Sequence, residues 1–234
     1  MTDMRYDAVI FDLFGTLIET VTPDNYDVML GELADTLGVD ADAFATEWRA
    51  TVNERESGLQ GGIDEILSRT STAAGHAPSA VEVAAAKRGW LAIAGGWLTP
   101  RDDARATLEA IRATGAKVGL LSNCSAEVPP LWPTAGVADL FDHLVFSCDV
   151  GAMKPHPSVY EAAYTSLGVD PRRCMFVGDG GARELTGASA VGMEAVLLRV
   201  PGEEHTWFDS FYRKDALEWP GTVVASLSEL TNLI

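Results

Sequence analysis

Residues 6–17 read YDAVIFDLFGTL, a short apolar run that stops at an acidic residue, Asp12. An apolar run of this length, with β-branched and aromatic side chains, predicts a buried strand over residues 6–11. Asp12 then stands at the carboxyl end of that strand. In open α/β sheets this is the end at which ligands bind. The stretch therefore predicts a functional aspartate at the edge of a sheet.

Downstream of residue 98, strand-like and helix-like segments alternate along the chain. Short apolar runs predict strands at residues 118–122, 144–146, 175–177, 195–198 and 223–225. Helices are expected between Thr99 and Gly115, over residues 157–167 and 182–191, and after Ser226. Such alternation predicts a Rossmann-like α/β fold, in which a doubly wound and mainly parallel sheet carries helices on both faces.

Residues 20–98 follow a different pattern, with no convincing strand. Apolar side chains recur at helical spacing, as in Tyr26, Met29, Leu30, Leu33 and Leu37. We interpret this block as an all-helical domain inserted after the first strand, where it covers the site as a cap. The expected division is a core domain of residues 1–19 and 99–234 and a cap domain of residues 20–98.

The composition limits the partners of the protein. The 234-residue chain has a formal net charge of −17, which disfavours binding to nucleic acid and to anionic membranes. It has no apolar run long enough to span a bilayer. Its three cysteines are odd in number and form no CxxC pair, a usage typical of the cytoplasm. We expect a cytoplasmic protein acting on a small anionic substrate; the oligomeric state is left open.

Polar side chains follow several of the predicted strands at the same edge of the sheet. They are Asp12, Ser122 with Asn123, and Asp179, while Lys154 follows the third strand. A carboxylate can act as a nucleophile and form a covalent intermediate, provided that a neighbouring cation keeps it ionised. No GxGxxG or Walker sequence follows a strand, so a dinucleotide or P-loop site is not indicated.

Four segments in this order resemble the motifs of the haloacid dehalogenase (HAD) hydrolase superfamily, and the resemblance covers the whole chain. The segments are residues 11–17, residues 121–123, residues 154–157, and residues 177–179 with Glu184. The insertion is similar to the helical cap of members that carry one after the first motif. The resemblance implies a hydrolase in which Asp12 is the nucleophile and Thr16 positions its loop. It also implies that Lys154 offsets negative charge.

The same resemblance assigns the remaining site residues. Ser122 and Asn123 would bind the group that is transferred. Mg²⁺ would be held by Asp12, Asp179 and the backbone carbonyl of Phe14. Glu184 stands where an aspartate is more usual, so its contact with the metal is expected to pass through water. Two carboxylates at adjacent strand ends repel each other, and a hard divalent cation relieves that repulsion.

Phe14 departs from the pattern of HAD phosphatases, which usually carry there a second aspartate that protonates the leaving group. The 2-haloacid dehalogenases have an aromatic residue at this position, because halide leaves without a proton. They also work without metal and carry serine and asparagine in the region of Asp179. A phosphatase lacking that aspartate should turn over alkyl phosphates poorly unless another residue, from the cap for example, supplies the proton.

The Trp48-Arg49 pair is similar to a pair that places a carboxylate-binding arginine in dehalogenases, although an arginine on the helix surface beside a core tryptophan explains the pair more readily. We favour a phosphatase acting on a small phosphorylated metabolite, with Arg49 binding substrate. The alternatives are a 2-haloacid dehalogenase and a HAD-fold binding or regulatory protein without catalysis.

An aromatic segment near the C-terminus is expected to serve packing or a subunit contact: Trp207, Phe208, Phe211, Tyr212 and Trp219.

Overall fold

A computed structural model describes residues 5–203 and 214–234 of the chain. Six parallel strands form one sheet in the order β3-β2-β1-β4-β5-β6. Their bounds are β1 Ala8–Phe11, β2 Lys117–Ser122, β3 His143–Phe146, β4 Cys174–Gly178, β5 Glu194–Leu198 and β6 Thr222–Val224. The prediction of a Rossmann-like, mainly parallel α/β sheet is confirmed.

The first strand lies at the centre of the sheet, between β2 and β4, and all four of its residues are buried. Because side chains alternate along a strand, Val9 and Phe11 pack into one hydrophobic core and Ala8 and Ile10 into the other. A strand covered on both faces reads as a continuous apolar run, which is why residues 6–11 carry so little polarity.

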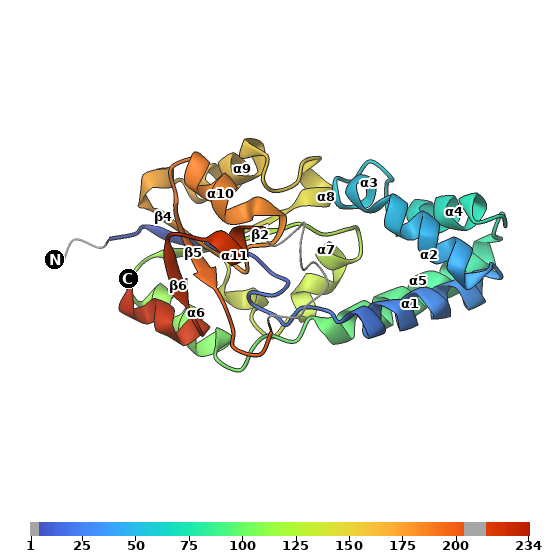
Figure 1. Cartoon of the computed structure of the whole chain (residues 1–234), viewed down its shortest axis with the longest axis horizontal. Helices are drawn as coiled ribbons and strands as arrows, with labels where there is room; N and C mark the ends of the chain where they lie inside the picture. The colour runs from blue at the N-terminus through green and yellow to red at the C-terminus, as the bar shows by residue number, and fades with distance from the viewer. Residues whose placement is uncertain (1–4, 204–213) are drawn as a thin grey trace.

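Helices cover both faces of the sheet (Figure 1). The helix α6 and a final 3₁₀ segment pack on the face of Val9, while α9 and α10 pack on the opposite face. The bounds after residue 98 are α6 Ala104–Ala113, α7 Val128–Leu131, α8 Ser147–Val150, α9 Pro157–Leu167, α10 Glu184–Ala190, α11 Lys214–Glu218 and the 3₁₀ helix Leu227–Asn232.

The inserted segment folds as five helices with a hydrophobic core of their own. They are α1 Pro23–Leu37, α2 Ala41–Ala50, α3 Val52–Glu56, α4 Ile63–Ala73 and α5 Ala80–Trp97. At the centre of this core the rings of Trp48 and Trp90 meet edge to face, with centroids 4.9 Å apart. Figure 1 shows the group of five helices extending to one side of the sheet. We propose that residues 20–98 and the rest of the chain are separate domains.

Two helix starts differ from the sequence-based expectation. The helix predicted from Thr99 begins only at Ala104, because Pro100 forms an isolated β-bridge with Ile18 instead of the first helical turn. The helix predicted from Ala182 begins at Glu184 because the two residues before it have positive φ angles. At the C-terminus the helix expected after Ser226 does begin at Leu227, as a 3₁₀ helix whose start has no side-chain hydrogen bond to cap it.

Of the C-terminal aromatic segment, only Trp219 is among the described residues; Trp207, Phe208, Phe211 and Tyr212 lie outside them. Trp219 packs partly buried against the core that α9 and α10 share. In the described part of the chain, no helix is both long and apolar enough to cross a membrane.

The proposed division into two domains predicts that a core mutation acts locally. Leu67 is fully buried in the helical insertion, so Leu67→Ala should lower stability by about 2–5 kcal/mol. In native-state hydrogen exchange, the loss of protection should be confined to α1–α5. The matched variant Leu185→Ala, in the core beneath α10, should instead affect the sheet and its helices. Equal loss of protection in both parts from either variant would contradict the division.

Candidate active site

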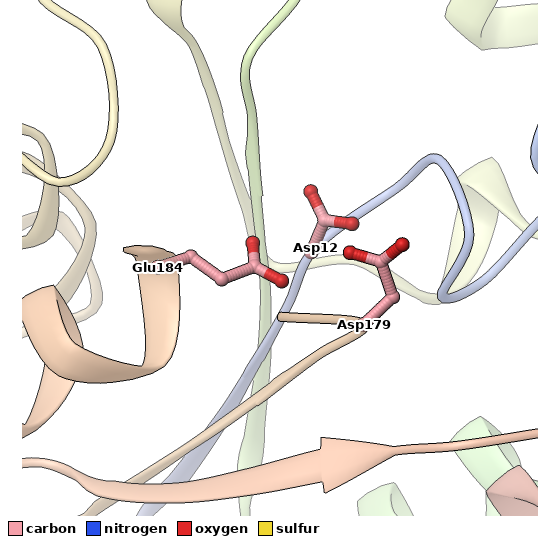
Figure 2. Close-up of side chains that lie close together, drawn as sticks. All are labelled: Asp12, Asp179 and Glu184. Atoms are coloured by element: carbon pink, nitrogen blue, oxygen red, sulfur yellow. The ribbon is translucent and has the colours of Figure 1, made fainter. Parts of the chain in front are cut away.

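The carboxyl ends of the two central strands bring two aspartates together. Asp12 follows β1 and Asp179 follows β4, and the backbone amide of Asp12 donates a hydrogen bond to the carbonyl of Val177 on β4 (2.9 Å). Glu184 joins them from the first turn of α10. One carboxylate oxygen from each of these three residues lies within 4.8 Å of the others. Figure 2 shows the three carboxylates pointing toward one another.

The loop after β1 is held close to this cluster. Gly15 has a φ angle of +81°, and a Cβ atom there would clash with the carboxylate of Asp179. Only glycine meets both demands without strain. The Arg101 side chain donates hydrogen bonds from Nε to the carbonyl of Thr16 (2.8 Å) and from an Nη to that of Gly15 (3.1 Å), and it also pairs with Glu203. The sequence interpretation had placed Arg101 in a helix and missed this contact.

Thr16 fixes the orientation of Asp12. Its hydroxyl donates a hydrogen bond to Oδ2 of Asp12 (3.0 Å), and both side chains are buried. The other carboxylate oxygen of Asp12, Oδ1, accepts a hydrogen bond from the ammonium of Lys154. The two oxygens are thus held from different directions, which gives the carboxylate one defined geometry.

Lys154 lies buried between two carboxylates. Its ammonium contacts Asp12 and also donates to Oε2 of Glu184 (2.6 Å). Asn123 holds the backbone of this residue, because its amide oxygen accepts from the Lys154 amide (2.8 Å) and its amide nitrogen donates to the Lys154 carbonyl (3.4 Å). Asn123, expected to bind substrate, therefore also positions the lysine.

The charges in this cluster shift one another's pKa values. Burial alone would lower the pKa of Lys154, but the charges of Asp12 and Glu184 raise it above its ordinary value, so the ammonium stays protonated. Burial raises the pKa of Asp12, while Lys154 lowers it and Asp179 raises it. Burial also raises the pKa of Glu184, and the charge of Asp12 adds to that effect. Burial and mutual repulsion thus act against the charged forms of Asp12 and Glu184, and within the cluster Lys154 acts in the opposite direction.

The cluster fits a hard divalent cation. The formal charges of three carboxylates exceed that of one ammonium by two. Carboxylate oxygens are the ligands that Mg²⁺ prefers, and a dication at this point would relieve the repulsion. Both oxygens of Glu184 already accept hydrogen bonds, Oε1 from the amide of Gly180 (2.9 Å) and Oε2 from Lys154. Both oxygens of Asp12 are engaged in the same way, by Thr16 and Lys154, so hydrogen bonding does not rank the three carboxylates as ligands, and the indirect contact expected of Glu184 stays a prediction.

A cavity of about 420 Å³ opens beside the cluster, between the sheet edge and the helical insertion. Asp12, Phe14, Asn123 and Lys154 line it from the core. Ser122, the expected ligand of the transferred group, is fully buried at the end of β2 and is not part of the cavity wall. Its role in binding stays a prediction.

The arginine that lies against Trp48 is Arg55, not Arg49. The guanidinium carbon of Arg55 is 4.2 Å from the centroid of a Trp48 ring, and its Nη1 donates to the Trp48 carbonyl. Arg49 reaches the cavity wall, but its side chain is half exposed and pairs with Asp27. Arg49 therefore lies at the rim of the cavity, and its role in binding substrate stays a prediction.

The cavity is also lined by two acids that the sequence alone does not single out. Glu56 ends α3 in the insertion, and Glu127 precedes α7 in the core. Burial raises the pKa of Glu56 to about 7 and also raises the pKa of Glu127. Neither residue belongs to a motif, and only the three-dimensional fold brings them to the cavity that holds Asp12.

The sequence of the chain matches the haloacid dehalogenase-like hydrolase family over residues 6–192. The chain belongs to this family.

Within the haloacid dehalogenase-like hydrolases, the chain is similar to proteins of two activities. It is 40% identical over 103 residues to a phosphatase of Mycobacterium tuberculosis, covering 43% of this chain and 47% of that protein. It is 26% identical over 230 residues to a phosphoglycolate phosphatase of Yersinia pseudotuberculosis, covering 95% and 90% of the two chains. The crystal structure of a 2-haloacid dehalogenase from Pseudomonas syringae pv. tomato superimposes with a TM-score of 0.70 at 22% identity, over 97% of both chains.

The ion pairs of Lys154 predict a large stability effect. Lys154→Met leaves Asp12 and Glu184 buried without their cation, which should cost about 3–5 kcal/mol. The matched variant Lys87→Met, which breaks an exposed pair with Asp64, should cost no more than about 1 kcal/mol. Urea unfolding at neutral pH in the presence of EDTA measures both. Similar losses for the two variants would show that Lys154 does not neutralise the buried carboxylates.

Proposed function

We propose that the protein is a Mg²⁺-dependent phosphatase that acts on a small phosphorylated metabolite through an aspartyl-phosphate intermediate on Asp12. The observation that carries the proposal is the cluster of Asp12, Asp179 and Glu184 around a single lysine, whose excess negative charge calls for a divalent cation. A dehalogenase, which by the resemblance works without metal, has no need of Asp179. The similarity to a phosphoglycolate phosphatase over nearly the whole chain supports the same activity.

The arrangement gives each core residue a separate task. Asp12, oriented by Thr16, attacks the phosphorus atom, and its bond to phosphorus forms as the bond to the leaving oxygen breaks. Lys154 offsets the charge of the nucleophile and of the phosphate that approaches it. Mg²⁺, held by Asp12, Asp179 and the carbonyl of Phe14, would supply further positive charge to the phosphate oxygens. Water then attacks phosphorus and frees Asp12.

The cavity sets an upper limit on the substrate. Its volume of about 420 Å³ lies in the range of small-molecule sites, and the helical insertion contributes part of its wall. We therefore propose that the insertion selects a small phosphorylated metabolite. Arg49, at the rim of the cavity, is one of the cationic side chains that can bind this substrate.

A 2-haloacid dehalogenase is the second candidate, and one residue favours it. Phe14 lines the cavity beside Asp12, where the phosphatase pattern has a second carboxylate. The superposition with a 2-haloacid dehalogenase supports the shared fold alone.

Loss of the nucleophile should abolish turnover. Asp12→Asn keeps the shape of the side chain but removes its negative charge, so phosphate release should fall by on the order of 10³-fold or more. Asp24→Asn removes the same charge from the exposed start of α1 and should behave as the wild type. A variant of Asp12 that keeps more than about a tenth of the wild-type rate would remove this residue from the mechanism.

Metal dependence separates the two candidates. Phosphate release from 4-nitrophenyl phosphate should require Mg²⁺ and stop when EDTA is added, because the carboxylate cluster would otherwise repel the phosphate. Chloride release from 2-chloropropionate should be undetectable in either condition. Chloride release that persists in EDTA, without phosphatase activity, would instead assign the protein to the dehalogenases.

A further inference from the structure

We propose that Glu56, contributed by the helical insertion, is the acid that protonates the leaving oxygen and the base that then activates water. The inference rests on the proposed phosphatase function and deepens it. In HAD phosphatases this proton transfer is usually the task of a second aspartate close to the nucleophile. Phe14 stands at that position here and cannot transfer a proton, so the inference assigns the task to the insertion.

Glu56 faces the same cavity as the nucleophile. It lines the wall together with Asp12, Phe14 and Lys154. No hydrogen bond or ion pair of its carboxylate is found among the described residues; the residue keeps some accessible surface, while its carboxyl group is largely shielded from water. The carboxyl group is thus available to a bound substrate. An in-line displacement puts the leaving group opposite Asp12, and the helical insertion covers the cavity that opens beside the cluster.

The other acid of the cavity is less suited to the task. The Oε2 atom of Glu127 has almost no accessible surface and no hydrogen-bond partner, and the carboxylate is also held by a hydrogen bond with Ser125. A group that donates a proton to substrate must come within hydrogen-bond distance of it. Of the two acids, Glu56 is therefore the one whose carboxyl can meet the substrate.

The turn after α3 fixes Glu56 against the core domain. Gly58 has a φ angle of +72°, and a Cβ atom there would clash with the carbonyl oxygen of Cys148 on α8. The turn is closed by a hydrogen bond from the amide of Gly58 to the carbonyl of Arg55 (3.1 Å). Figure 1 shows α3 beside α8, the two elements that make this contact. Glu56, two residues before Gly58, is thereby held at the boundary between the insertion and the core.

The surroundings of Glu56 suit proton transfer near neutral pH. Burial raises the pKa of Glu56 to about 7; Arg55 lowers it, Glu127 raises it, and Lys154 lowers it. Tyr26 and Cys124 are also close enough for the charge of Glu56 to raise their pKa values. The packed helix α8 carries two more titratable groups, Cys148 and Asp149. An acid with a pKa near the working pH serves equally as proton donor and acceptor.

The proposed reaction balances in two steps. In the first, the bond from Asp12 to phosphorus forms, the bond from phosphorus to the leaving oxygen breaks, and the proton of Glu56 moves to that oxygen to give the alcohol. In the second, the Glu56 carboxylate takes a proton from water while the water oxygen bonds to phosphorus and the bond to Asp12 breaks. Inorganic phosphate leaves, and Asp12 and protonated Glu56 are restored.

The test compares leaving groups in Glu56→Gln. The substrates are 4-nitrophenyl phosphate, whose leaving group needs no proton, and two alkyl phosphates, 2-phosphoglycolate and glycerol 3-phosphate. For an alkyl phosphate that the wild type hydrolyses, kcat/KM should fall by about 10²–10⁴-fold in Glu56→Gln. For 4-nitrophenyl phosphate it should fall by less than about tenfold, which also shows that the variant is folded. Glu54→Gln, an exposed acid on the same helix, should match the wild type.

The pH profile gives an independent readout. Because Glu56 must be protonated in the first step, wild-type kcat/KM for the alkyl phosphate should decline as the pH rises through about 7, and Glu56→Gln should lack this decline. Equal losses of kcat/KM for aryl and alkyl substrates in Glu56→Gln, or a pH profile unchanged by this substitution, would overturn the inference. Neither result would contradict the proposed phosphatase activity. A wild type that hydrolyses 4-nitrophenyl phosphate but neither alkyl phosphate would also overturn it. A wild type that hydrolyses none of them would overturn the proposed function as well.

Discussion

The ammonium of Lys154 is the contact on which the site depends. It is buried between Asp12 and Glu184, two carboxylates that come from the ends of different elements. Without it, the carboxyl ends of β1 and β4 would bring together three acids in a region with little access to water. Buried charges of one sign are costly unless they are paired, so this lysine makes the position of Asp12 compatible with a stable fold.

In the function that we propose, the tasks are divided between the two parts of the chain. The sheet edge provides rigid groups: Asp12 held by Thr16, and Lys154 held by Asn123 through its backbone. Groups on strand ends are positioned by the regular sheet, which suits a nucleophile that must be aligned closely. In our proposal the insertion provides Glu56, the acid that donates a proton to the leaving group. A HAD-like hydrolase that lacks a second acid in its first motif would then obtain one from the segment that also encloses the substrate.

The sequence predicted the parallel sheet, the helical nature of the insertion and the carboxylates at the sheet edge, but not which residues of the insertion line the cavity. Residues 6–11 revealed the central strand because a strand buried on both faces is apolar throughout, and the four motifs located the acids and Lys154 because strand ends in a parallel sheet share one edge. Glu56 and Arg55 could not be found this way, since helical periodicity does not say which polar residue will face a cavity formed together with a distant part of the chain. The start of α6 was misplaced because Pro100 at a typical helix start forms a bridge to Ile18 here.

A crystal structure with Mg²⁺ and beryllium fluoride, a stable mimic of the phosphoryl group, tests the central claim most directly. The account predicts that trifluoroberyllate is bonded to a carboxylate oxygen of Asp12, with Lys154 still in contact with Asp12 and Mg²⁺ bound by Asp12 and Asp179. Trifluoroberyllate bonded to another residue, or Mg²⁺ bound away from these two aspartates, would contradict it.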